Sequence, residues 1–183
     1  MNAKYLIIVV LSLLMISCGG SSTMVKNTSA PEIKADPHNA TLVIYRSTSF
    51  GYGLTINNYL NNTFIGQTKG DSYFITKVAP GTHYIISEYD RNDCMKLTLE
   101  AGYVYYIKQG VYPGPILAHA GLSHTDHFSF SKTLKRLTCF SLKHDSKIPV
   151  MSEAKYKKTL KEFEKKSTEK QFKSRKLFFC AAY

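Results

Sequence analysis

The stretch HAGLSHTDH, residues 119–127, holds the densest group of side chains that could do chemistry. His119, His124, Asp126 and His127 are close together in this stretch, and imidazole with carboxylate suits zinc or a similar divalent metal. Their spacing matches neither an HExxH helix nor a His-x-His pair on one strand face. A polar loop would have the same composition. A metal-binding site, or a metal-dependent enzyme built on it, is therefore the alternative hypothesis for this sequence.

The same stretch offers a serine, Ser123, as a nucleophile. A nucleophile elbow requires glycine two residues after the serine, and this chain has Thr125 there. His124 and Asp126 are also too near Ser123 along the chain for a catalytic relay, whose members normally come from separate loops. The sequence therefore predicts a protein that is not an enzyme and that uses no cofactor.

A second kind of chemistry is available at Cys18, where an apolar run ends. One positive charge, Lys4, precedes an apolar stretch from Tyr5 to Ile16, which is the anatomy of a secretory signal. A membrane-spanning helix needs about 20 apolar residues, so this run is too short to be a single-pass anchor. The sequence therefore predicts export.

The residues Met15, Ile16 and Ser17 before Cys18 resemble the lipobox of bacterial lipoproteins. In that family the cysteine is acylated, for example with palmitate, and becomes the new N-terminus. Acyl chains contribute about 0.8 kcal/mol per buried methylene, so two or three of them hold a protein on a bilayer. Gly19 in place of aspartate implies, by that resemblance, an outer-membrane lipoprotein that faces the periplasm. An ordinary cleaved signal peptide with a chance cysteine is the other reading.

Three further cysteines follow, Cys94, Cys139 and Cys180. An exported chain meets an oxidising compartment, where disulfides persist, but three cysteines allow at most one internal bridge. We name Cys94 with Cys139 as the candidate pair, and three unpaired thiols as the alternative. No CxxC or CxxH spacing indicates a metal or redox motif.

The elements that would position these residues are short β-strands between Ala40 and Ser131. The run TLVIYRS at residues 41–47 has the length and the β-branched character of a buried strand. Tight turns are expected at Asn61-Asn62, Pro80-Gly81 and Ala101-Gly102. CMKLTLE alternates apolar and polar residues, which is typical of a strand with one face on a core. Strands every eight to twelve residues predict a mainly β fold, an antiparallel β-sandwich of about seven strands.

The strand order ATLVIYRS, INNYLNNTFIGQT, GDSYFITKVAPGTHYI and LTLEAGYVYYIKQG resembles a family of bacterial lipoprotein domains catalogued only as a domain of unknown function. That family is a small β-sandwich, similar in style to the PEGA surface modules. The resemblance covers roughly residues 40–131. It implies no catalytic residue, because the family has none established.

The C-terminal part of the chain carries nearly all of the net charge. Of the +11 total, residues 132–176 hold 15 Lys or Arg against 5 Asp or Glu. Ser152 is the expected N-cap of a basic helix over residues 152–176, and the segment SKTLKRLTCFSLKHDSKIP at residues 131–149 forms either a last strand or a crossing segment. Tyr156, Leu160 and Phe163 form a narrow apolar stripe, which predicts a mobile or loosely docked helix.

Two roles for the basic helix remain open. Lysines near an anionic surface contribute about 1 kcal/mol each, so the tail could bind anionic phospholipid or another anionic envelope polymer. The other reading is a solvated helix in which Glu162, Glu164 and Glu169 pair with lysines at helical spacing. Nucleic acid is not an expected partner, because the export signal separates the protein from it.

These observations predict a membrane-anchored envelope lipoprotein that acts as a non-catalytic binding or structural module. Its partners would be the bilayer, through acylated Cys18, and an anionic envelope surface or another envelope protein. The expected domain plan is a cleaved signal peptide, a lipidated flexible linker, a β-sandwich and a basic helical tail, at residues 1–17, 18–39, 40–145 and 146–183.

Overall fold

The computed structural model describes residues 23–48, 50–114, 118–144 and 146–180, with side-chain positions as far as Ser167. Cys18 therefore lies outside the described residues. The elements in the described part are β1 (Met24–Lys26), β2 (Ala40–Arg46), β3 (Ile56–Leu60), β4 (Thr63–Thr68), β5 (Ser72–Val78), β6 (Gly81–Glu88), β7 (Asp93–Leu99), β8 (Val104–Tyr112), β9 (His119–Thr125), α2 (His127–Leu134), β10 (Thr138–Leu142) and α3 (Glu153–Cys180).

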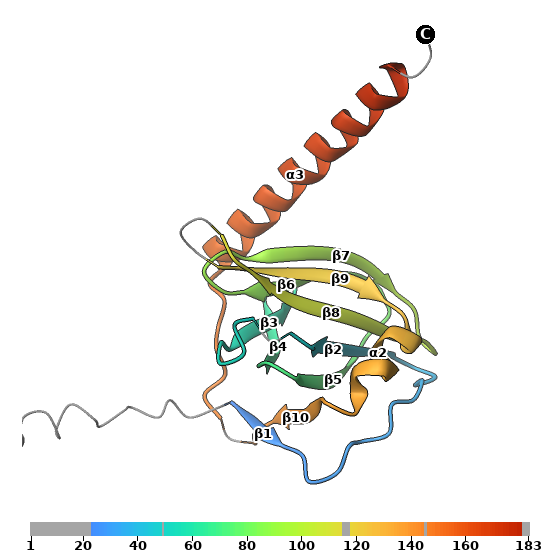
Figure 1. Ribbon diagram of the computed structural model, residues 1–183, viewed down its shortest axis with the longest axis vertical. Helices are drawn as coiled ribbons and strands as arrows, with labels where there is room; N and C mark the ends of the chain where they lie inside the picture. Colours follow the sequence, from blue (N-terminus) through green and yellow to red (C-terminus); the bar gives the residue numbers. More distant parts are fainter. Residues whose placement is uncertain (1–22, 49, 115–117, 145, 181–183) are drawn as a thin grey trace, which may run out of the picture.

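The strands form two packed sheets, and α3 projects from one end of them (Figure 1). The six-stranded sheet has the order β1-β10-β5-β2-β8-β9 and the four-stranded sheet has the order β4-β3-β6-β7. This confirms the prediction of a mainly β sandwich with a C-terminal helix. Two pairs, β2 with β8 and β10 with β5, are parallel. Strand β8 is added after the chain has crossed to the four-stranded sheet for β6 and β7, whereas β10 follows β9 of its own sheet through α2.

Strand β2 runs through the middle of the fold. All seven of its residues are buried, which agrees with its continuous apolar sequence and with a sheet covered on both faces. Leu42 and Ile44 pack between the two sheets, and Val43 and Tyr45 face the other side. There Phe130 of α2 packs edge-on against Tyr45, with ring centroids 5.1 Å apart. The helix thus closes the outer face of the six-stranded sheet.

A fully buried polar network joins the two sheets. Gln109 of β8 donates from Nε2 to Asn58 Oδ1 of β3 at 2.7 Å and to Ser87 Oγ of β6, and it accepts from Thr68 Oγ1 of β4. Ser87 also donates to Asn58 Oδ1 at 2.9 Å. Buried polar groups are costly unless they are hydrogen-bonded, so these four residues specify one arrangement of the sheets.

The tight turns predicted at Asn61-Asn62 and Ala101-Gly102 are confirmed, whereas Gly81 of the predicted Pro80-Gly81 turn is already the first residue of β6. Asn61, between β3 and β4, has a φ of 57°, and Gly102, between β7 and β8, has a φ of 82°. Asparagine and glycine are the residues that enter this region at least cost.

The N-terminal segment differs from the predicted flexible linker, because it is tied to the sandwich. β1 pairs antiparallel with β10, and Met24 is buried in the core. Thr23 donates from Oγ1 to Gln67 Oε1 at 2.6 Å, and Asp36 forms an ion pair with Lys77. These few contacts fix the described part of the N-terminal segment to the sandwich, although its composition indicates a flexible tether.

The segment after β9 was left open by the sequence, and the structure resolves it into α2 and β10. α2 begins inside the range expected to hold only strands, because Asp126 caps it. Within the described residues, no helix is both long enough and apolar enough to cross a bilayer.

Candidate anion-binding cleft

The first turns of α3 are docked on the outer face of the four-stranded sheet. Ser152 begins the helix as predicted, since its hydroxyl accepts from the backbone N–H of Lys155 at 3.3 Å. The buried Met151 and the apolar stripe of α3 then pack against strands β3, β4, β6 and β7 through Tyr59, Phe64, Ile86 and Cys94. Phe163 meets Tyr84 edge-on at 6.2 Å between ring centroids. The stripe that looked too narrow for firm packing therefore has a matching apolar surface.

Glu88, the last residue of β6, fixes the helix electrostatically. Its carboxylate accepts from Asn57 Nδ2 at 3.0 Å and from Tyr59 OH at 2.7 Å, and it forms an ion pair with Lys155. Burial acts to raise the pKa of Glu88, but the hydrogen bonds from Lys155, Asn57 and Tyr59 outweigh it and lower that pKa below its ordinary value. Burial and the Glu88 charge raise the pKa of Tyr59, which keeps its hydroxyl a donor.

A second polar contact joins α3 to the turn between β6 and β7. Asn92 Nδ2 donates to Thr159 Oγ1 at 3.1 Å, and the Thr159 hydroxyl donates to the Lys155 carbonyl at 3.0 Å. Thr159 is buried although the helix around it is covered with lysine. The turn and the helix are therefore held at a defined separation.

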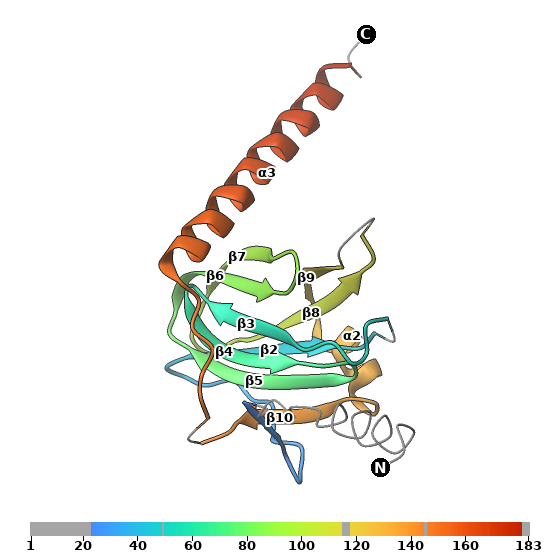
Figure 2. The same cartoon turned by 90° about the vertical axis from the view of Figure 1, so that its left-hand side faces the viewer.

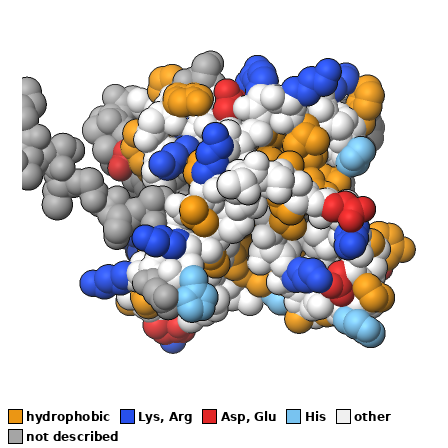
Figure 3. All heavy atoms as spheres, turned by 90° about the horizontal axis from the view of Figure 1, so that it is seen from below, with side chains coloured by type: hydrophobic (Ala, Val, Ile, Leu, Met, Phe, Trp, Pro, Cys, Tyr) orange, Lys and Arg blue, Asp and Glu red, His pale blue; other side chains and the backbone are white. Residues whose placement is uncertain are grey.

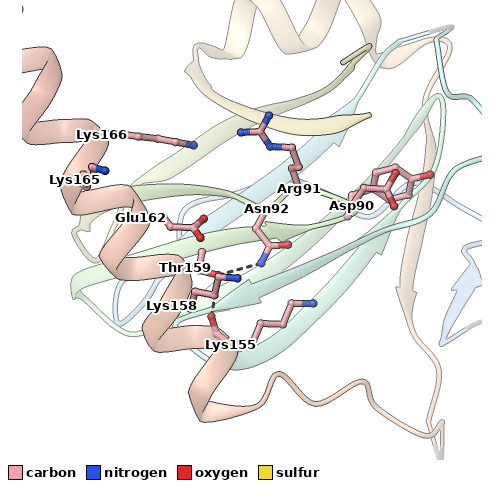
Figure 4. Close-up of a pocket in the computed structure, with 10 residues that line it drawn as sticks. Asp90, Arg91, Asn92, Lys155, Lys158, Thr159, Glu162, Lys165 and Lys166 are labelled. Carbon is pink, nitrogen blue, oxygen red and sulfur yellow. Dashed lines mark hydrogen bonds between the residues drawn. The ribbon is translucent and has the colours of Figure 1, made fainter. Parts of the chain in front are cut away.

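That separation leaves a cleft of about 590 Å³ between α3 and the β6–β7 turn (Figure 4). Its walls carry five cationic side chains and two carboxylates, and the lining residues are Tyr89, Asp90, Arg91, Asn92, Lys155, Lys158, Thr159, Glu162, Lys165 and Lys166. A concave surface lined mainly by one sign of charge concentrates counter-ions. The arrangement favours the binding of an anion.

A smaller hollow of about 170 Å³ continues from the cleft toward the start of β9. Arg91, Asn92 and Lys166 line both spaces, and His119 lies on the wall of the smaller one. The backbone here is fixed, because Arg91 forms a β-bridge with His119 and its carbonyl accepts from Ala120 N at 3.4 Å. Arg91 thus stands at the junction of the two spaces.

The residues predicted as metal ligands are not brought together. His119 stacks on Tyr112, with ring centroids 5.5 Å apart, and His127 lies edge-on to Tyr106 at 5.6 Å. His124 is exposed on β9 five residues after His119, so the strand rise of about 3.3 Å per residue puts it far away. Among the described residues no group of three or more His, Cys, Asp or Glu could hold a metal ion. The four side chains are therefore not arranged around one point in the described structure.

Asp126 has a structural role instead. Its carboxylate accepts from the backbone N–H of Ser129 at 2.7 Å and caps α2, and that hydrogen bond lowers the pKa of Asp126. Ser123 donates to the Lys108 carbonyl at 3.3 Å. The stretch is therefore neither a loop nor a ligand cluster, but strand β9 followed by the N-cap of α2.

The proposed bridge between Cys94 and Cys139 is absent, and both are free, buried thiols. They lie in different sheets, Cys94 on β7 beside Met151 and Cys139 on β10 beside Phe130. Burial raises the pKa of the Cys94 thiol to about 12, and Asp93 adds to the shift. Both cysteines act as small apolar core residues.

Sequence reasoning did not single out Arg91 or Asn92, which give the cleft its second wall. The polar run YDRND at residues 89–93 looked like an ordinary turn between two strands. The sequence does contain both parts of the cleft, a polar turn and a lysine-rich helix. Only the docking of α3 shows that the two lie side by side.

Comparison with known proteins finds sequence similarity but names no activity. The profile of a family described as protein of unknown function (DUF2846) matches residues 36–121, from the segment before β2 to β9. The chain is similar to this family over that range. An uncharacterized protein of Haemophilus influenzae is 26% identical over 134 residues, which cover 71% of this chain and 80% of that protein. No solved structure matches the chain.

Proposed function

We propose that this protein is a lipoprotein of a bacterial cell envelope, anchored through acylated Cys18, and that its sandwich is a non-catalytic binding module. The observation that carries the binding role is the basic cleft between α3 and the β6–β7 turn. The cleft is built by specific docking contacts of α3, which a merely solubilising lysine helix would not need. An anionic component of the envelope is the partner that its charge favours.

The anchor rests on the sequence from Lys4 to Cys18, with its short apolar run and small residue before the cysteine. Thr23, the first described residue, is buried and tied to Gln67. Five residue steps separate it from Cys18, and an extended chain spans at most about 3.6 Å per residue. The sandwich would therefore be held close to the bilayer, on the periplasmic side of the outer membrane if Gly19 has the sorting role that the lipoprotein resemblance implies.

A binding role fits the use of the polar side chains better than catalysis does. Asp126 caps a helix, Glu88 fastens α3, and Gln109 joins the sheets. Each of these groups stabilises the fold where it stands. We therefore propose no reaction for this domain.

The anchor is tested by metabolic labelling with an alkyne-bearing fatty acid. We expect the wild-type chain and a Cys180→Ser variant to incorporate the label and to partition into the detergent phase. A Cys18→Ser variant should incorporate none, because it lacks the thiol that is acylated. Label retained by Cys18→Ser, or absent from the wild-type chain, would refute the lipid anchor.

A further inference from the structure

Two cationic side chains from different elements converge across the cleft. In Figure 4, the guanidinium of Arg91, from the β6–β7 turn, and the ammonium of Lys166, from α3, extend toward one another. Of the other cations that line the cleft, Lys155 is already paired with Glu88. Neither Arg91 nor Lys166 has an ion pair within the described residues. Like charges that face each other repel, and an anion between them turns the repulsion into attraction.

The two walls are held in place before any ligand arrives. Arg91 is fixed through its backbone to the start of β9, and its neighbour Asn92 is hydrogen-bonded to Thr159 of α3. The ion pair of Lys155 with Glu88 holds the helix one turn earlier. A site that is already arranged loses less free energy in ordering when it binds.

We propose that the cleft binds a phosphate group between Arg91 and Lys166, with Lys165 and Lys158 adding positive charge. An arginine fork donates two parallel hydrogen bonds to phosphate oxygens, and lysine supplies a point charge. Phosphate fills only part of about 590 Å³, so the group belongs to a larger molecule. This inference deepens the proposed function, since it names the ligand chemistry of the same cleft.

The position of the cleft indicates whether its phosphate ligand comes from the anchoring bilayer or from the envelope space. β1, the element nearest Cys18 in sequence, and α3 lie at opposite ends of the molecule in both ribbon views (Figures 1 and 2). A chain held at Cys18 by a short link therefore turns the cleft away from its own bilayer. The phosphate belongs to a component of the envelope space and not to the headgroups of the anchoring membrane.

Replacement of Glu162 should change the phosphate affinity in the opposite direction to replacement of Arg91 or Lys166. The Glu162 carboxylate lines the same cleft and repels an anion there. Its removal should strengthen phosphate binding, whereas removal of Arg91 or Lys166 should weaken it. A structural disturbance of the cleft would weaken binding in all three variants.

The experiment is calorimetric titration of inorganic phosphate into the mature full-length protein in neutral detergent. We expect Arg91→Gln and Lys166→Gln each to weaken binding by about tenfold, since each removes a charged hydrogen-bond donor. Glu162→Gln should tighten it. The control Lys108→Gln/Lys161→Gln, which removes two exposed charges outside the cleft, should leave the affinity unchanged. No phosphate binding by the wild-type chain, or equal losses in the control, would overturn the proposal.

A second experiment distinguishes the phosphate of a lipid headgroup from that of a molecule outside the bilayer. The protein is reconstituted into vesicles of phosphatidylcholine, with or without phosphatidylglycerol, at 0.15 M salt, where the Debye length is about 8 Å. Equal phosphate affinity in both supports a ligand from outside the bilayer, and a loss of affinity with phosphatidylglycerol overturns that source. Neither experiment depends on fatty-acid labelling, so failure of the phosphate site and failure of the lipid anchor are told apart.

Discussion

At the residue scale, single polar side chains decide how the two sheets fit together. Gln109 is the only member of the buried network on the six-stranded sheet, and its amide meets Asn58, Ser87 and Thr68 of the other sheet. All four residues are fully buried. Water cannot replace a lost partner at such a site, so the network makes one register of the sheets more stable than its alternatives.

Replacement of Gln109 by leucine tests this directly. Gln109→Leu should lower the free energy of unfolding by about 2–3 kcal/mol, because it leaves the buried Thr68 hydroxyl without its acceptor and removes the donor to Asn58 and Ser87. Urea unfolding followed by circular dichroism measures it. The control is Thr98→Val, which removes an exposed hydrogen bond between the Thr98 and Thr82 hydroxyls at 3.1 Å. Water can take over there, so its cost should be under about 1 kcal/mol. Equal costs for the two variants would contradict the role given to the network.

The sequence identified residues whose behaviour is local and missed those that depend on distant neighbours. Asn61 was predicted from the positive φ of a tight hairpin, which neighbouring residues alone determine. The candidate ligands from His119 to His127 are close in sequence but separated in space, because they lie along one strand and at a helix cap. The pairing of Cys94 with Cys139 was wrong because the sequence does not say which sheet each strand joins.

At the scale of elements, α3 is an outlying helix with a firmly attached base. Tyr156, Leu160 and Phe163 were recognised as one face, and Ser152 as its N-cap. The docking surface was not foreseeable, because it combines four strands that are distant in sequence. β1 was missed for a similar reason, since its three residues pair with β10 from the far end of the domain.

The attachment of α3 should depend on pH through Glu88. The folded-state pKa of this carboxyl lies below its ordinary value, which we take for the unfolded chain. Its stabilising contribution is therefore complete above the unfolded pKa and is lost as the pH falls through the folded pKa. Glu88→Gln should cost about 1–2 kcal/mol of unfolding free energy at pH 7, and wild type and variant should converge once the pH falls below the folded-state pKa.

The control for this experiment is Glu153→Gln. Glu153 pairs with Lys157 on the exposed surface of α3, where both side chains are more than half exposed, so its removal should have little effect at either pH. Urea unfolding at pH 7 and near pH 2 provides the measurement. A Glu88→Gln deficit that does not shrink on acidification would show that Glu88 acts through packing and not through its charge.

At the scale of the whole molecule, β1 and α3 are well separated. β1 is at one end, and α3, which forms one wall of the cleft, is at the other (Figures 1 and 2). The face opposite α3 shows hydrophobic side chains scattered among charged and polar ones (Figure 3). The chain order of signal, sandwich and basic helix does not predict this separation, and the short link between Cys18 and the sandwich became evident only with β1.

The central claim is that Cys18 holds the sandwich against a bilayer while the basic cleft points away from it. The most direct test places a genetically encoded fluorophore at Val25 on β1 or at Lys161 on α3, both exposed, in the natively lipidated protein reconstituted with lipids that carry a quencher on their headgroups. We predict strong quenching at position 25 and weak quenching at position 161, and loss of the difference in Cys18→Ser. Equal quenching at the two positions, or stronger quenching at position 161, would contradict the account.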